Sequence, residues 1–280
     1  MHRDGWDLFH SAVDTDLLDR VRAGIVRTFG HQFRRHGIDA SGVWDKDALF
    51  TSMCALFKKS PSTFFATARL AQCLPEIMAV SGSDGLIGAL KSGGLSEPGF
   101  VLIPNIVFMS TSFYVEGGYN RRPPHQDWLS IQGSLDSVVA WIPLHDVSAD
   151  EYPIEVWNGS HLEGLMQSER SSCGTKVIDP RLPDVAPNPL VMRYGDVGLM
   201  SSFVVHRTGE GPADSMRVAL TLRYNNMAEP DFIERDYPMP STMKISREAI
   251  PGGDPGPEKL REFFGQTGDG AKATRGNIVS

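Results

Sequence analysis

The sequence predicts a mainly antiparallel β-sandwich or barrel, with helices that precede the strands and pack on one sheet. The character of the chain changes near Gly99, with amphipathic helical segments before it and short strands after it. About eight β-branched and aromatic runs then follow one another without intervening helices, which is typical of antiparallel sheets rather than of parallel α/β sheets. All-β barrels of about 200–250 residues often form one domain, so we expect a single domain over residues 1–280.

Three parts of that domain differ in pattern: a helical part over 1–99, a barrel core over 100–225 and a C-terminal extension over 226–280. Apolar residues at three- to four-residue spacing predict the helices, and Ser60-Pro61 supplies an N-cap and a first helical residue for one of them. The expected helices cover 14–35, 45–58, 60–78 and 84–91.

The strands of the core are separated by Gly, Pro, Asn or Asp. They are expected at 101–108, 110–115, 137–144, 153–157, 175–178, 189–194, 197–205 and 216–224. The extension is rich in proline and charge, and we expect its last dozen or so residues to be disordered.

Composition excludes several classes of protein. The net charge of −7 and the pI near 5.6 argue against a general nucleic-acid binder or an anionic-membrane binder. Cys54, Cys73 and Cys173 are odd in number and form no C-x-x-C pair, so we expect buried, reduced thiols rather than disulfides or a zinc site. An acidic start without a signal-peptide pattern, and no apolar run of about 18 residues, predict a cytoplasmic protein without a membrane span.

The chemistry is indicated by one of three His-x-Asp/Glu triplets. Chance alone gives about one such triplet in a chain of this composition, so the setting decides its meaning. His2-Arg3-Asp4 lies at the terminus and His161-Leu162-Glu163 follows a turn, whereas His125-Gln126-Asp127 follows a sheet-like stretch and the pair Pro123-Pro124. Side chains at i and i+2 of an extended segment point to one face, so His125 and Asp127 can bind one metal.

Two histidines and one carboxylate on one side of a metal are the ligands of non-haem Fe(II) oxygenases. His206 is the natural second histidine, because it ends the apolar run 197–205. Arg217 begins an otherwise apolar strand eleven residues later, which suggests an anionic partner. Two alternatives stay open: His206 as a hydrogen-bonded core residue, and Arg217 paired with a structural carboxylate such as Asp196.

In this order and spacing, the motifs resemble those of the phytanoyl-CoA dioxygenase family of Fe(II)- and 2-oxoglutarate-dependent oxygenases, over roughly residues 100–225. The segments that carry the resemblance are His125-Gln126-Asp127-Trp128, Trp141-Ile142-Pro143-Leu144, Asn158-Gly159-Ser160-His161, and Gly195-Asp196 through His206 to Arg217. Departures from the family pattern are Tyr114-Val115-Glu116 where a lysine is common, Asn158 where a proline is usual, and Asp214-Ser215 where an asparagine is frequent.

The resemblance implies a double-stranded β-helix, a jelly-roll or cupin-like barrel, with Fe(II) bound by His125, Asp127 and His206. It implies that Arg217 pairs with the C5 carboxylate of 2-oxoglutarate, and that Trp141, Thr208 and Ser110 contact this cosubstrate. We expect the protein to be a dioxygenase that consumes O2 and 2-oxoglutarate and acts as a hydroxylase. The metal carboxylate is present, and this favours hydroxylation over halogenation.

The substrate class is less sharply indicated. Aromatic walls with a few polar groups are usual in small-molecule sites, and the candidates near the motif are Asn105, Tyr114, Trp128 and Arg122. We expect a small-molecule substrate, no nucleic-acid or membrane partner, and a monomer or homodimer. The alternatives are the same iron chemistry used for desaturation, ring formation or epimerisation, or a barrel that binds without catalysis.

Overall fold

The computed structural model describes residues 1–101, 104–115, 121–171, 174–238 and 256–270. Its α-helices are α1 (Thr15–Arg35), α2 (Lys46–Lys59), α3 (Pro61–Ala71), α4 (Pro75–Ser81), α5 (Asp84–Ser92), α6 (Trp128–Ile131), α7 (Pro230–Glu234) and α8 (Pro257–Gly270), with 3₁₀ turns η1 (Thr111–Phe113) and η2 (Ser160–Glu163). None of the helices in these ranges is both long enough and apolar enough to cross a membrane.

The strands are short, as expected. They are β1 (Trp6–Phe9), β2 (Pro98–Phe100), β3 (Asn105–Met109), β4 (Val138–Pro143), β5 (Ile154–Val156), β6 (Ser168–Ser171), β7 (Gly174–Val177), β8 (Asn188–Leu190), β9 (Val197–Ser201), β10 (His206–Thr208) and β11 (Arg217–Asn226).

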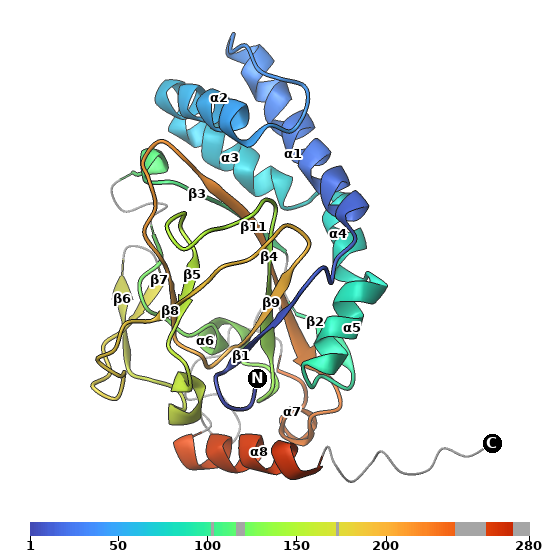
Figure 1. The fold of residues 1–280 in the computed structure, drawn as a ribbon, viewed down its shortest axis with the longest axis vertical. Coiled ribbons are helices and arrows are strands. Elements are labelled where there is room, and N and C mark those ends of the chain that lie inside the picture. The colour runs from blue at the N-terminus through green and yellow to red at the C-terminus, as the bar shows by residue number, and fades with distance from the viewer. Residues whose placement is uncertain (102–103, 116–120, 172–173, 239–255, 271–280) are drawn as a thin grey trace, which may run out of the picture.

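Every strand pair is antiparallel (Figure 1). The larger sheet has the order β1-β9-β4-β11-β2, and β3 pairs with β11 beside β2. A smaller sheet has the order β10-β5-β8, and β6 and β7 form a separate hairpin. The fold is therefore mainly sheet with flanking helices, and within the described ranges the sheets stay separate rather than joining into a closed barrel.

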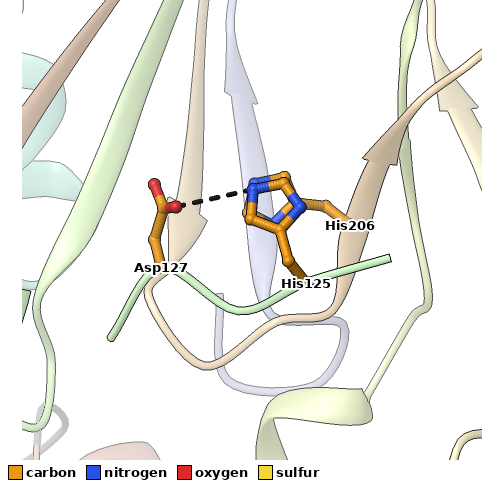
Figure 2. Close-up of side chains that lie close together, drawn as sticks. All are labelled: His125, Asp127 and His206. Atoms are coloured by element: carbon orange, nitrogen blue, oxygen red, sulfur yellow. Dashed lines mark ion pairs between the residues drawn. The ribbon is translucent and has the colours of Figure 1, made fainter. Parts of the chain in front are cut away.

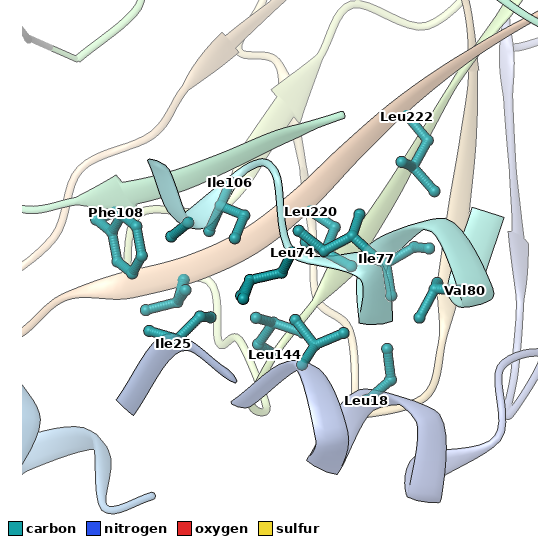
Figure 3. Close-up of a cluster of buried hydrophobic side chains, with 14 of the residues drawn as sticks. Leu18, Ile25, Leu74, Ile77, Val80, Ile106, Phe108, Leu144, Leu220 and Leu222 are labelled. Atoms are coloured by element: carbon teal, nitrogen blue, oxygen red, sulfur yellow. The ribbon is translucent and has the colours of Figure 1, made fainter. Parts of the chain in front are cut away.

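Helices α1 to α5 cover one face of the larger sheet, as the sequence predicted (Figure 1). Alternate residues of β11, from Val218 to Tyr224, belong to the same hydrophobic cluster as the helices. Figure 3 shows Leu220 and Leu222 of this strand packed with Leu18, Ile25 and Ile77 of the helices.

The opposite face of the larger sheet packs on the smaller sheet. Ala219 of β11 and Trp141 of β4 share a second cluster with Val156 and Leu190. Because side chains alternate along a strand, Arg217, Thr221 and Arg223 share the face of Ala219. The odd-numbered face of β11 therefore carries polar residues into the space between the two sheets.

Several expected elements differ from the observed ones. The segment 60–78 is two helices, because Pro75 disfavours helical backbone at Leu74, which is extended at φ −62° and ψ 127°. The segment 110–115 contains the 3₁₀ turn η1 instead of a strand, since Ser110 caps that turn and the centre of the Phe113 ring lies 4.5 Å from that of Phe64.

Four strands lie outside the predicted ones: β1, β2, β6 and β10. Cys73 is exposed and Cys54 is half-buried, so the expectation of buried thiols is wrong for Cys73, while Cys173 lies outside the described residues. The tail 271–280, expected to be disordered, also lies outside them.

Truncating Leu220 tests the packing of helices on sheet. This side chain is fully buried in the helix-facing cluster, so Leu220→Ala is expected to lower the free energy of unfolding by about 2–5 kcal/mol through lost burial and a cavity. Urea denaturation measures the change. The matched control is Leu70→Ala on α3, where the side chain is 63% exposed and the change is expected to stay within about 0.5 kcal/mol. Equal losses at both positions would contradict the described core.

Stability is expected to fall with rising pH because of Asp136, in the loop before β4. Burial raises the pKa of Asp136 to about 6, although Asn226 donates to its Oδ2 at 2.7 Å. A carboxyl group with a raised pKa in the folded state stabilises the protein while it is protonated, and this contribution is lost as pH rises from about 4 through 6.

Asp136→Asn cannot ionise but can still accept from Asn226 through its amide oxygen. We expect this variant to be more stable than the wild type by about 2–3 kcal/mol at pH 8 and by little near pH 4, as measured by urea denaturation at both values. A difference independent of pH would contradict this account of Asp136.

Candidate metal and cosubstrate site

His125, Asp127 and His206 meet between the two sheets. The backbone places the two histidines side by side, because the N–H of each donates to the carbonyl oxygen of the other, at 2.9 and 3.0 Å. His206 begins β10, and His125 lies in the segment that continues the smaller sheet beyond β10. Gln126 points away, and its Nε2 donates to the carbonyl oxygens of Gly164 and Phe203.

One ligand atom from each of the three residues lies within 4.8 Å of the other two. Within the described part of the chain, this is the only cluster of His, Cys, Asp and Glu side chains with that geometry. Figure 2 shows Asp127 facing the two imidazoles, and His125 Nε2 lies 3.6 Å from Asp127 Oδ1. The exposed fraction of each residue is only 5–6%.

Each histidine presents its Nε2 atom to the centre of this group. His125 Nδ1 lies 2.8 Å from the carbonyl oxygen of Pro123, and His206 Nδ1 lies 3.1 Å from that of Val204. A carbonyl oxygen can only accept, so Nδ1 carries the proton and Nε2 keeps a lone pair in the neutral ring. Metal-binding histidines are usually oriented in this way.

The electrostatics of the group favour neutral imidazoles and a charged carboxylate. Burial, together with the neighbouring His206, lowers the pKa of His125 to about 3, and burial also lowers the pKa of His206. Burial acts to raise the pKa of Asp127, but the Arg223 guanidinium and the two imidazoles outweigh it and hold that pKa well below its usual range. All three side chains are thus in the protonation states that metal binding requires.

Arg217 is almost fully buried, at 1% exposed, and lies on the face of β11 that also carries Ala219, Thr221 and Arg223. Its Nε donates to the carbonyl oxygen of Tyr152 at 3.0 Å, and its guanidinium carbon lies 5.2 Å from the centre of the Trp141 ring. Ala219 pairs with Pro143 at the end of β4, and Thr221 pairs with Trp141, so Trp141 lies further along β11 than the backbone of Arg217. The Arg217 guanidinium therefore meets the Trp141 ring on the side toward Thr221 and Arg223.

Buried polar atoms on this face are consistent with a bound polar molecule. Trp141 Nε1 and Thr221 Oγ1 are both buried without a hydrogen-bond partner, and the two residues are paired directly across β4 and β11. A buried donor without a partner costs about 1–3 kcal/mol, so such groups call for an explanation. Both atoms lie on the face of the sheet that also carries Arg217.

The other predicted cosubstrate residues have mixed surroundings. Thr208 is buried and shares a face with His206, two residues earlier on β10. Ser110 is buried too, but its Oγ accepts from the backbone N–H of Ser112, which is the cap of η1. Trp141 has the free donor described above.

Among the predicted substrate residues, Arg122 is the one whose charge acts on the triad. It is exposed, and its charge contributes to lowering the pKa of each of the three triad residues. Its neighbour Arg121 is paired with Glu210, at 2.9 Å. The structure thus distinguishes the two arginines, which the sequence could not.

The remaining substrate candidates are turned elsewhere. Trp128 is fully buried against Phe203 under α8, which leaves no exposed face for a substrate. Asn105 Oδ1 accepts from Gln72 of the helical part, at 2.7 Å. Tyr114 is 54% exposed and lines no buried wall.

Two further residues named in the sequence analysis, His161 of another His-x-Asp/Glu triplet and Asp196, have partners of their own. His161 is fully buried against Phe264, with Nε2 3.2 Å from the carbonyl oxygen of His2, so it packs under α8 and lies outside the triad. Asp196 accepts from the backbone N–H groups of Ser11 and Arg193 and is not the partner expected for Arg217.

Two residues with contacts at this site were missed by sequence reasoning. Arg223 donates to Asp127 through Nε at 3.1 Å and Nη2 at 2.8 Å, and Thr221 supplies the buried hydroxyl. The available signal was the alternation of polar and apolar residues along 217–223, which marks one polar face of the strand.

An open pocket of about 650 Å³ lies nearby, lined by Glu155, Arg207 and Glu210 among others. Arg207 alternates with His206 and Thr208 along β10, so this pocket opens on the other face of that strand. None of the predicted site residues lines it.

Comparison with known proteins relates the chain to others only through its fold. No protein-family model matches the sequence, and no curated protein matches it. Among solved structures, the apo form of the non-heme monooxygenase ThoJ is similar with a TM-score of 0.53 and 14% identity, over 80% of this chain and 75% of that one. The nickel complex of ThoJ has a TM-score of 0.50 at the same identity and coverage. AviO1 from Streptomyces viridochromogenes Tue57 has a TM-score of 0.52 and 17% identity, over 82% of this chain and 93% of that one.

Proposed function

We propose that the chain is an Fe(II)- and 2-oxoglutarate-dependent oxygenase that acts on a small molecule. The observation that carries the proposal is the buried cluster of His125, Asp127 and His206, in which both imidazoles are oriented by backbone carbonyls with Nε2 free. A two-histidine, one-carboxylate group with open positions is the ligand set of non-haem Fe(II) oxygenases. The similar fold of a non-heme monooxygenase, which also binds nickel, supports the same class.

The finer fold assignment is part of this proposal. Strands alternate between the sheets along the chain: β5 and β8 of the smaller sheet lie between β4 and β9 of the larger one, and β10 of the smaller sheet lies between β9 and β11. The segment around His125 extends the smaller sheet through its bridge to His206. This alternation supports a double-stranded β-helix of the phytanoyl-CoA dioxygenase type, with the triad at the junction of the sheets.

Each residue has a distinct task in this proposal. His125 and His206 would hold the metal through Nε2, and Asp127 would hold it through its carboxylate. Arg217 pairs with the distal carboxylate of 2-oxoglutarate, for which a planar guanidinium can supply two parallel donors. Trp141 and Thr221 donate to the cosubstrate, while burial of the site keeps competing water away from these hydrogen bonds.

The metal, when bound, couples oxidative decarboxylation of 2-oxoglutarate by O2 to succinate and CO2 with oxidation of the substrate. With the metal carboxylate in place, hydroxylation of an unactivated C–H bond is the proposed outcome. Arg122, exposed beside the triad, is the proposed contact for an acidic group of the substrate. Desaturation, ring formation and epimerisation remain the second candidate, because they need the same residues and differ in substrate pose. Mass spectrometry of the product separates them: a gain of one oxygen, a loss of two hydrogens, or no change.

Anaerobic titration calorimetry tests the proposal. We expect 2-oxoglutarate to bind the protein when Fe(II) is present and to bind far more weakly without it, since the metal would supply part of its binding site. Binding that is equal with and without Fe(II), or absent in both, would contradict the proposed function.

A further inference from the structure

Arg223 is paired with the carboxylate of Asp127, the proposed metal ligand. It lies on the odd-numbered face of β11, and its side chain is 15% exposed, against 6% for that of Asp127. Nε and Nη2 both donate to the same oxygen, Oδ2, at 3.1 and 2.8 Å. The other oxygen, Oδ1, faces Nε2 of His125.

This division between the two carboxylate oxygens has a consequence for metal binding. A carboxylate can bind a metal through one oxygen or through both. Two donors from one guanidinium hold Oδ2 in a fixed direction, and charge-assisted hydrogen bonds of this kind are about twice as strong as neutral ones. Only Oδ1 is then available to the metal.

We propose that Arg223 is a positioning residue that makes Asp127 a ligand through one oxygen only. The inference rests on the proposed function and extends it. One atom from each of His125, Asp127 and His206 would then hold the metal, and its other positions would stay free for 2-oxoglutarate and O2. A second oxygen from Asp127 would take up a position that the proposed reaction needs.

The surrounding charges support this role. Arg223 forms an ion pair with Asp127, with Nη2 2.8 Å from Oδ2. Other arginines near the site have other partners: Arg121 is paired with Glu210, and Arg207 with Glu155. Within the described residues, Arg223 is the only arginine that forms an ion pair with a triad residue.

Binding of Co(II), a visible probe of coordination, tests the inference without turnover. We compare the wild type with Arg223→Gln and Arg223→Lys, and use Arg121→Gln as a control that loses the same charge near the site but contacts no triad residue. Loss of an outer partner of a metal ligand typically weakens binding about 10–100-fold. We expect that loss for Arg223→Gln, with shifted visible Co(II) bands, a smaller loss for Arg223→Lys, and wild-type binding for Arg121→Gln.

Thermal unfolding of the metal-free proteins shows whether each variant folds. If Arg223→Gln does not fold, Arg223→Lys carries the test, since it keeps the charge and loses the two-donor geometry. Unchanged Co(II) affinity and bands in folded Arg223 variants would overturn the inference and leave the proposed function intact. Equal losses in Arg121→Gln would overturn it as well, because charge rather than position would then be responsible. A wild type that binds no Co(II) would overturn the proposed function itself.

Discussion

Replacing Asp127 with alanine is expected to abolish metal binding at micromolar Fe(II) or Co(II). The variant removes one of the three proposed ligands and leaves the half-buried Arg223 without its carboxylate partner. Loss of a direct ligand must exceed the roughly 10–100-fold effect of losing an outer partner. Calorimetric titration of the metal-free protein measures the change, and succinate formation from 2-oxoglutarate is expected to be lost with it.

The chain contains its own matched control for this experiment. Asp4 ends another His-x-Asp triplet, but its carboxylate pairs with the exposed Arg3. Asp4→Ala is therefore expected to bind metal like the wild type. Similar metal affinity in Asp127→Ala and the wild type would show that the buried triad is a structural cluster.

Replacing Arg217 with alanine is expected to remove 2-oxoglutarate binding while metal binding persists. Loss of one partner from a buried charge pair typically costs about 3–5 kcal/mol, which corresponds to a roughly 150- to 5,000-fold weaker affinity. Anaerobic titration of the Fe(II)-loaded variant with 2-oxoglutarate measures the loss, and a Co(II) titration of the same preparation shows that the metal site is intact.

Arg217 is also buried beneath Trp141, so folding needs its own control. Arg217→Lys keeps the charge with a single ammonium group and is expected to bind 2-oxoglutarate more weakly than the wild type but more strongly than Arg217→Ala. If the alanine variant folds and binds 2-oxoglutarate like the wild type, another residue holds the distal carboxylate.

The pairing of His125 with Asp127 could be predicted from the sequence because it follows from a local rule, whereas His206 was identified from the order of the motifs. His125 and Asp127 share a face through the two-residue period of extended chain, and His206 ends an apolar run. The roles of these residues in binding Fe(II) stay predictions, as do the single-domain organisation and the cytoplasmic location.

The contacts of Arg223 could not be predicted, because they depend on the register between distant segments. Arg223 pairs with Val139 of β4, and β4 pairs with β9. Asp127 comes near Arg223 only because the N–H of Trp128 donates to the carbonyl oxygen of Ser202, just after β9. β10 was missed for a related reason: three residues that include a histidine and an arginine show no apolar alternation.

Trp128 shows where local reasoning led to the wrong side of the chain. The aromatic residue after the motif was expected to face the substrate, but the short helix α6 begins at Trp128 and turns it toward Phe203. Leu260 and Phe264 of α8 complete that cluster, and α8 itself was not predicted in the Pro- and charge-rich extension.

The most direct test of the account is the visible absorption spectrum of the wild-type protein under anaerobic conditions, after addition of Fe(II) and then 2-oxoglutarate. We expect a weak charge-transfer band that appears only when both are present, because a metal held by His125, Asp127 and His206 would have open positions for the chelate. The band should be lost or weakened in Arg217→Ala. Its absence in a folded wild-type protein with both additions would contradict the claim that this site binds iron and 2-oxoglutarate together.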